Sequence, residues 1–226
     1  MKHARAKLND LLRSVVPGSP VPSARFESAG YIARLRRFNA SENYRSDLRR
    51  VLALLQPFHG MKVLDFGCGL GEATAVLSEL GCAATGVDIG STTLEVAARE
   101  HPAAAFLRMP TLPRDQDAAI ALHTLSYVPS SYEAVSAIHD ALRPGGRLVL
   151  CEPNPLFVFA MLPLNLFNEY VPDENLVYCR GSRSWKRVLT AAGFHDIEIG
   201  FHGEFPGLLR VRALRSRLVA VAHKLR

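Results

Sequence analysis

The chain has 226 residues, of which 48% are hydrophobic, and a formal net charge of +6 at pH 7. This length and apolar content suffice for one domain with its own core, and no apolar run is long enough to span a membrane. The first residues are charged and lack the apolar segment of a secretory signal, so we expect a cytosolic protein. The cysteines have no paired spacing, which predicts reduced thiols and neither disulfides nor a zinc site; they are Cys68, Cys82, Cys151 and Cys179.

The charge is unevenly distributed along the sequence. Residues 1–58 and 180–226 carry an excess of lysine and arginine, whereas residues 59–179 carry an excess of acidic residues. Basic ends of this kind suit solvated helix faces. They equally suit contact with nucleic acid, an anionic membrane surface, an acidic carrier protein or an anionic small substrate.

The first 58 residues are predicted to form an amino-terminal helical cap. Helices are expected over residues 3–15, 24–38 and 42–56, and a cluster of prolines and glycine separates the first two. Ser41 is a residue type favoured at a helix N-cap. The apolar residues that follow it, among them Leu48 and Leu55, have helical spacing.

Residues 59–226 are predicted to form an α/β domain, because strand and helix patterns alternate from residue 61. Strands are expected over 61–66, 82–88, 104–108, 117–123, 146–152, 194–202 and 217–223, and helices over 70–80, 91–100, 130–142, 183–192 and 204–216. Such alternation predicts a parallel sheet with helices on both faces.

A glycine-rich turn follows the first expected strand, in Val63-Leu-Asp-Phe-Gly-Cys-Gly-Leu-Gly71. Glycines let the backbone turn tightly and let a ligand lie directly against it. Asp88 ends the second strand, where an acid can accept hydrogen bonds from the ribose hydroxyls of a nucleoside. Glu72 stands where a dinucleotide-binding fold has its third glycine, and no Gly-Lys-Ser/Thr phosphate loop occurs.

These segments resemble the class I S-adenosylmethionine-dependent methyltransferases. The glycine-rich segment resembles the first motif of that family, and Gly86-Val-Asp-Ile89 resembles its ribose-binding acidic segment. Leu142-Arg-Pro-Gly-Gly-Arg-Leu-Val-Leu150 and Ala191-Ala-Gly-Phe194 resemble two later motifs, in the family's order. The resemblance implies a Rossmann-like seven-stranded sheet of order 3-2-1-4-5-7-6 with an antiparallel seventh strand. It also implies S-adenosylmethionine as cofactor and S-adenosylhomocysteine as product.

The resemblance further implies which residues bind the cofactor. The glycines would lie against the methionine and the ribose, Asp65 would organise the methionine amino group, and Asp88 would bind the ribose hydroxyls. The full expected set is Asp65, Gly67, Cys68, Gly69, Gly71, Asp88, Ile89, Met109, His123 and Tyr127.

Four residues are candidates for contact with the substrate. His123, at the end of the fourth strand, is the candidate general base for an acceptor hydroxyl or ammonium; the alternative is a histidine that positions a ligand without moving a proton. Glu152, Phe157 and Tyr31 are candidate substrate-binding residues. Glu152 could hold a substrate amine or cap a loop, and Tyr31 or Arg36 of the cap could lie near the methionine carboxylate.

An apolar insert is expected over about residues 153–183, where several prolines prevent one long helix. We expect it to form a wall or lid over an apolar acceptor through Phe157, Phe159 and Phe167. A dimer interface and simple core packing are the alternatives.

We therefore expect a methyltransferase that acts on oxygen or nitrogen of a small metabolite. No metal is expected, because the sequence has no clustered set of metal ligands. RNA methylation through the basic ends is one alternative, although those ends have few aromatics and no recognisable RNA-binding module. A non-catalytic S-adenosylmethionine-binding protein is another, although the glycine turn and Asp88 are intact.

Overall fold

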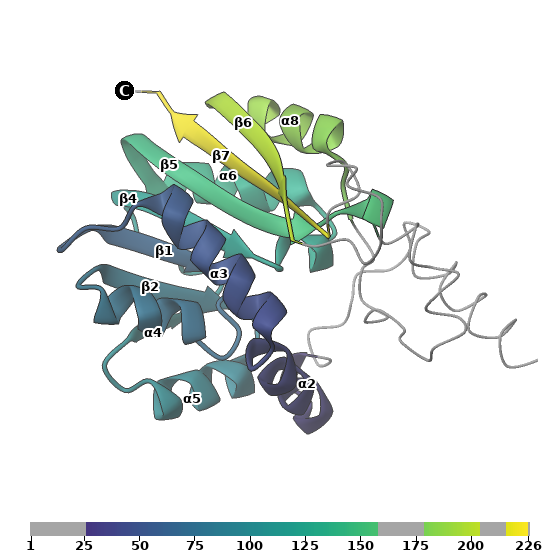
Figure 1. Ribbon diagram of the computed structural model, residues 1–226. Coiled ribbons are helices and arrows are strands. Elements are labelled where there is room, and N and C mark those ends of the chain that lie inside the picture. The colour runs from purple at the N-terminus through teal and green to yellow at the C-terminus, as the bar shows by residue number, and fades with distance from the viewer. Residues whose placement is uncertain (1–25, 158–178, 204–215, 226) are drawn as a thin grey trace, which may run out of the picture.

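The computed structural model describes residues 26–157, 179–203 and 216–225 (Figure 1). The helices expected over residues 3–15 and 204–216 lie outside the described residues, apart from Ser216, and so do Phe159 and Phe167.

A seven-stranded sheet of order β3-β2-β1-β4-β5-β7-β6 forms the centre of the domain (Figure 1). Its strands are β1 (Lys62–Phe66), β2 (Ala83–Asp88), β3 (Ala105–Arg108), β4 (Gln116–Leu122), β5 (Leu142–Pro153), β6 (Phe194–His202) and β7 (Arg217–Lys224). The first five strands pair in parallel, and β7 runs antiparallel to both β5 and β6. The expected strand order and the antiparallel last strand are confirmed.

Strand β5 begins four residues earlier than the sequence predicted. Leu142 already pairs with Gln116, and regular pairing resumes where Arg147 meets Ala118. The Pro-Gly-Gly segment between them is therefore an irregular part of the strand and not a turn before it. Gly146 has to be glycine here, because a Cβ would lie 2.9 Å from the Arg143 carbonyl oxygen.

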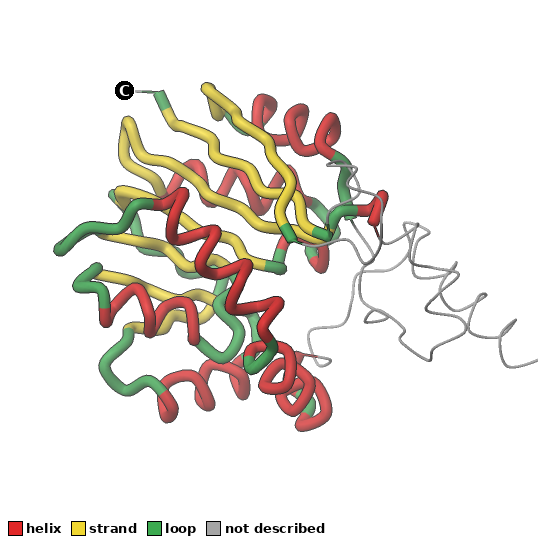
Figure 2. Tube along the Cα trace, viewed as in Figure 1, coloured by secondary structure: helices red, strands yellow, loops and turns green. Residues whose placement is uncertain are grey.

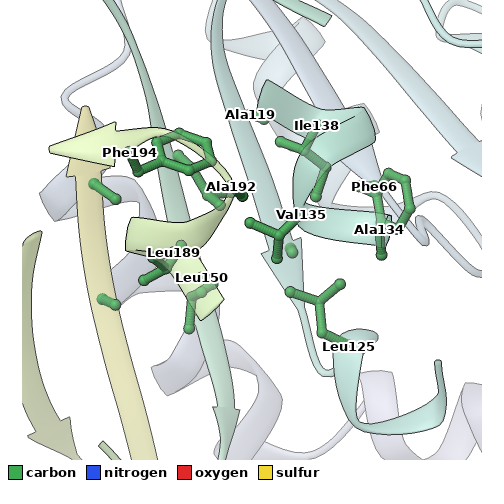
Figure 3. Close-up of a cluster of buried hydrophobic side chains, with 14 of the residues drawn as sticks. Phe66, Ala119, Leu125, Ala134, Val135, Ile138, Leu150, Leu189, Ala192 and Phe194 are labelled. Atoms are coloured by element: carbon green, nitrogen blue, oxygen red, sulfur yellow. The ribbon is translucent and has the colours of Figure 1, made fainter. Parts of the chain in front are cut away.

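Helices cover both faces of the sheet, as Figures 1 and 2 show. They are α2 (Ala29–Asn39), α3 (Glu42–Leu55), α4 (Glu72–Glu79), α5 (Ser91–Glu100), α6 (Ser131–Ala141) and α8 (Ser182–Ala191), with a short 3-10 turn, η2 (Leu125–Tyr127). Side chains of α6 and α8 pack with one face of β4 and β5 in the cluster shown in Figure 3. Side chains of α3 and α4 form a second cluster on the opposite face.

The sequence of the cap helix α3 explains where the helix begins and ends and which of its faces is buried. The Ser41 hydroxyl accepts a hydrogen bond from the Tyr44 amide at 3.2 Å, as expected of an N-cap, and Gln56 ends the helix in a left-handed conformation. Tyr44, Leu48, Val51 and Leu55 are buried against the sheet. Each such side chain contributes about 1.5–3 kcal/mol by leaving water. An acid, Asp47, is buried on the same helix.

Candidate active site

The glycine turn lies at the carboxyl end of β1 and has the left-handed backbone that its sequence predicts. Gly67, Gly69 and Gly71 have φ angles of +76°, +55° and +85°. At Gly67 a side chain has no room, because a Cβ would fall 2.1 Å from Thr124 Cγ2. At Gly69 an added Cβ would make an ordinary van der Waals contact with Leu35 Cδ1 of α2 at 3.6 Å, without a clash. Helix α2 therefore lies close to the glycine turn at Gly69.

Asp88 lies beside this turn at the end of β2. Its Oδ2 accepts a hydrogen bond from the Gly69 amide and its Oδ1 one from the Gly90 amide, both at 3.0 Å. Burial raises the pKa of the Asp88 carboxyl, and these hydrogen bonds oppose the rise. The next residue, Ile89, has a large apolar side chain that is 44% exposed. An acid next to an uncovered apolar surface suits a ribose with its attached base.

Asp65 lies beneath the turn and is 2% exposed. Thr74 Oγ1 donates a hydrogen bond to Asp65 Oδ2 at 2.6 Å. Burial raises the pKa of Asp65 to about 7, and the nearby carboxylates of Asp88 and Glu72 add to the rise. A cationic ligand close to this acidic group would favour its ionised form, which suits the ammonium and sulfonium charges of S-adenosylmethionine.

The segment before α2 is attached to the start of α5, next to Asp88. The Glu27 carboxylate accepts hydrogen bonds from the amides of Ser91 and Thr92 at 3.2 Å and from their hydroxyls at 2.8 Å. These bonds hold the pKa of Glu27 at about 2. The Phe26 carbonyl accepts a further bond from Thr93 Oγ1 at 2.7 Å. The first described residues of the cap are thus bonded to the start of α5, close to the end of β2.

Aromatic side chains connect the cap to η2. The Phe26 ring packs edge-on against Tyr31, with centroids 5.2 Å apart, and against Tyr127, with centroids 6.4 Å apart. Tyr31 and Tyr127, which the sequence predicted to contact substrate and cofactor, therefore both pack against the Phe26 ring. Arg36, which was expected near the methionine carboxylate, instead forms an ion pair with Glu100 at the far end of α5.

His123 follows β4 and has a φ of +56°, unusual for a residue other than glycine. Its Nε2 lies 2.9 Å from Asp47 Oδ2, and the Phe38 ring packs edge-on against the imidazole. Arg217 Nε donates to the same Asp47 oxygen at 2.7 Å. Burial, together with the Arg217 charge, lowers the pKa of His123, although Asp47 opposes this. Burial therefore favours the neutral form of the imidazole.

The comparisons with known proteins agree with this geometry. A family described as "Methyltransferase domain" matches residues 35–199, well over half of the chain. The chain belongs to the S-adenosylmethionine-dependent methyltransferases. S-adenosylmethionine is the cofactor of this family, and the glycine turn, Asp88 and Asp65 fit it in the ways given above.

Among curated relatives of this methyltransferase is the ubiquinone biosynthesis O-methyltransferase of Pseudomonas aeruginosa, 29% identical over 143 residues, which cover 58% of this chain and 59% of the relative. Another is the S-adenosyl-L-methionine-dependent Diels-Alderase iccD of Talaromyces variabilis, 27% identical over 62% of this chain and 54% of the relative. The chain thus matches less than two thirds of the length of these relatives.

A solved structure with a similar fold comes from Thermotoga maritima and is described as a possible histamine N-methyltransferase. Its TM-score is 0.68 at 18% identity, and the match covers 86% of this chain and 96% of the other. At this identity the likeness shows the fold alone.

The structure corrects the expectation that Glu152 of the methyltransferase binds a substrate amine. Its side chain is fully buried, and its carboxylate accepts hydrogen bonds from the amides of Thr124, Leu125 and Ser126 at 2.8–3.1 Å and from the Ser126 hydroxyl at 2.6 Å. Burial raises the pKa of Glu152 to about 7 against the effect of these bonds. Glu152 therefore holds the loop after β4, the second of its two expected roles.

The remaining predicted residues lie around the same edge of the sheet. The Met109 amide donates to the Asp88 carbonyl at 2.9 Å, and Met109 is half-buried. Burial raises the pKa of the Cys68 thiol well above its usual value, so Cys68 contributes no thiolate. Phe157 is half-buried beyond the end of β5. Its place in an acceptor wall stays a prediction.

One group of potential metal ligands appears that the sequence did not reveal. Ligand atoms of Asp47, His123 and Cys151 lie within 4.8 Å of one another. The group does not fit a divalent cation for two reasons. The Arg217 guanidinium donates a hydrogen bond to Asp47 Oδ2, and burial raises the pKa of Cys151, which therefore stays a protonated thiol. Within the described residues, the structure also has no helix of the length and apolarity needed to cross a membrane.

Asp47 and Arg217 are functional candidates that the sequence reasoning missed. Asp47 interrupts the apolar face of α3, between Tyr44 and Leu48, and an acid at such a position was the available signal. Arg217 belonged to the basic carboxyl-terminal segment and had no distinguishing pattern of its own.

Proposed function

We propose that this methyltransferase transfers a methyl group to a hydroxyl or an amine of a small organic acceptor, with His123 as the general base. The observation that carries the proposal is the position of His123, directly before the residue that joins the end of β4 to the glycine turn. The neighbouring Thr124 hydroxyl donates to the Gly67 carbonyl at 3.0 Å, which joins the end of β4 to the turn. A neutral imidazole can take a proton at pH 7.

Binding of the cofactor is assigned to the residues around the turn. Asp88 would accept from the ribose hydroxyls, Ile89 and Met109 would contact the adenine, and Asp65 would face the methionine amino group. S-adenosylmethionine supplies a methyl group that is already activated by its sulfonium. The protein then has to exclude water and align the acceptor, for which the cap and the buried strand ends provide the walls.

The acceptor is proposed to lie between the cap and the segment that follows β5. The half-buried Tyr31 ring and the half-buried Phe157 ring offer apolar contact. An aromatic lining of this kind suits an apolar or aromatic acceptor. The relative named an O-methyltransferase supports a hydroxyl as the first acceptor group to test.

The decisive experiment measures release of S-adenosylhomocysteine from S-adenosylmethionine in the presence of a panel of phenols, catechols and aryl amines, such as 3,4-dihydroxybenzoate. We expect turnover with at least one of them and loss of at least about 100-fold in His123→Gln. Calorimetry with S-adenosylhomocysteine separates the loss of a base from the loss of a cofactor contact, because only the second would weaken binding in the variant. Full turnover by His123→Gln would leave His123 a positioning residue only.

A second reaction class is favoured by one specific relative, the S-adenosylmethionine-dependent Diels-Alderase. Such a protein would need the same glycine turn and Asp88 without consuming the methyl group. Binding of the cofactor with no S-adenosylhomocysteine released from any acceptor of the panel would support this alternative and contradict methyl transfer to the tested groups.

A further inference from the structure

A buried polar cluster joins the cap to the edge of the sheet that carries the proposed base. Asp47 of α3 is at its centre and has a side chain 3% exposed. It faces His123 after β4, Arg217 at the start of β7 and, with 3.8 Å between Oδ1 and Nε2, His202 at the end of β6. The His202 ring also meets Ser46 Oγ at 3.1 Å. Three strand ends thus converge on one helix residue.

The backbone turns His123 toward this cluster. Along β4, Ala118, Ile120 and Leu122 pack on the α3 side of the sheet, while the residues between them pack on the α6 side. Simple alternation would direct His123 to the α6 side. Its left-handed conformation instead places the ring against Asp47 and Phe38 of the cap. A conformation of this kind persists where surrounding contacts determine it.

The charged groups of the cluster determine which ring nitrogen of His123 carries the proton. Arg217 donates to the Asp47 oxygen, and its charge and the His123 hydrogen bond hold the pKa of Asp47 below its usual value although burial raises it. An ionised carboxylate only accepts hydrogen bonds, so Nε2 of His123 carries the proton in this contact. Nδ1 of the neutral ring then has a free lone pair. Among the residues that the structure describes, the hydrogen bond of the His123 ring is made through Nε2.

We propose that Asp47 is a positioning residue that holds His123 as its Nε2–H tautomer, which leaves Nδ1 to accept the proton of the acceptor hydroxyl. The inference rests on the function proposed above. The N–H bond at Nδ1 forms as the acceptor O–H bond breaks, the oxygen electron pair bonds the methyl carbon, and the electron pair of the S–CH₃ bond remains on sulfur. The resulting imidazolium would be stabilised by the Asp47 carboxylate.

This arrangement would make the base dependent on the cap. Asp47 belongs to α3, whereas His202 and Arg217 belong to the sheet and His123 directly follows β4. The proton-accepting form of His123 would therefore be set only when α3 is packed on β4 and β5. Cys151, the remaining ionisable group of the cluster, stays a neutral thiol because burial raises its pKa.

The tautomer can be measured directly in the whole protein. Long-range proton–nitrogen NMR spectra of the ¹⁵N-labelled chain with S-adenosylhomocysteine, assigned with His123→Gln, should show one neutral Nε2–H form at pH 7. Asp47→Asn should replace it by a mixture of tautomers. Ser46→Ala is the matched control, because it removes the neighbouring contact to His202 and leaves Asp47 in place. An Nδ1–H form in the wild type, or an unchanged spectrum in Asp47→Asn, would overturn the inference.

Turnover separates positioning from structural support. With an acceptor from the panel, Asp47→Asn should lower kcat by about 100-fold and leave the Kd for S-adenosylhomocysteine unchanged, and Asp47→Glu should recover part of the loss. A merely structural role would instead lower the Tm and the cofactor affinity and leave the tautomer intact. If the wild type turns over no acceptor, the proposed function fails, while the spectra still decide whether Asp47 sets the tautomer.

Discussion

The Gly69 amide donates a hydrogen bond to the Asp88 carboxylate across 3.0 Å, which joins the glycine turn of β1 to the acid at the end of β2. The same carboxylate accepts from Gly90 on its other oxygen. One side chain therefore fixes the shape of the turn and carries the oxygens that a ribose would need. Replacement of Asp88 should affect both.

Asp88→Ala should weaken S-adenosylhomocysteine binding by about 10- to 100-fold, since a hydrogen bond to a charged group contributes about 1.5–3 kcal/mol. Calorimetric titration measures this. Asp140→Ala, an exposed acid on α6, is the control for loss of one negative charge and should bind like the wild type. Unchanged affinity in Asp88→Ala would contradict the ribose assignment.

Two glycines of the turn, Gly67 and Gly69, should respond differently to alanine. In Gly67→Ala the new Cβ would overlap Thr124, so we expect loss of at least about 2 kcal/mol of unfolding free energy. In Gly69→Ala only the left-handed strain remains, about 1–2 kcal/mol, but the methyl group would lie on the surface of the turn where we place the cofactor, in contact with Leu35. Cofactor affinity should therefore fall more than tenfold, or about 1.4 kcal/mol.

Gly60→Ala is the matched control for this pair. Gly60 has a φ of +82° and no atom within 4 Å of a new Cβ, and it lies before β1, away from the turn. It should show the strain of Gly69→Ala in urea unfolding and normal cofactor binding in calorimetry. Equal affinities for Gly60→Ala and Gly69→Ala would argue against a cofactor at the turn.

Local patterns allowed much of this site to be predicted from sequence. The glycine turn and Asp88 are recognisable because each role depends on residues close together in the chain. The Asp47 cluster was not predictable in this way, because Asp47 meets His123 from 76 positions away and Arg217 from 170. For a related reason, the sequence allowed two possible roles for Glu152 and could not decide between them. Its place at a strand end is visible in the sequence, but the loop amides that occupy its carboxylate are not.

The ionisation of Asp65 should lower the stability of the cofactor-free protein as the pH rises from about 4 to 7. The folded pKa of Asp65, about 7, lies above its ordinary value of 3.8, so in this window the folded state retains a proton that the unfolded chain has lost. This group should contribute a slope of about 1.4 kcal/mol per pH unit. The stability it provides is fully present below pH 4 and is lost as the pH passes through 7.

Urea unfolding of wild type and Asp65→Asn at pH 5, 6 and 7 tests this, because the amide keeps an acceptor for Thr74 but does not titrate. The variant should show a shallower decline than the wild type. Glu152, whose pKa is also about 7, accounts for part of the slope in both proteins. Parallel curves for the two proteins would show that Asp65 does not titrate in this range.

Glu27→Gln should loosen the cap where it meets α5. Gly90, the N-cap of α5, offers no side-chain acceptor, and the Glu27 carboxylate takes its place at the Ser91 and Thr92 amides. The pKa of about 2 means that this contact holds above the ordinary pKa of a glutamate and is lost only as the pH falls through 2.

Hydrogen exchange followed by mass spectrometry should show faster exchange in the first turn of α5 in Glu27→Gln. Cofactor affinity should also fall, because the cap lies close to the end of β2. Glu42→Gln, an exposed glutamate paired with Arg49 within the cap, should change neither quantity. Unaltered exchange at Ser91 and Thr92 in Glu27→Gln would mean that the cap is held there by other contacts.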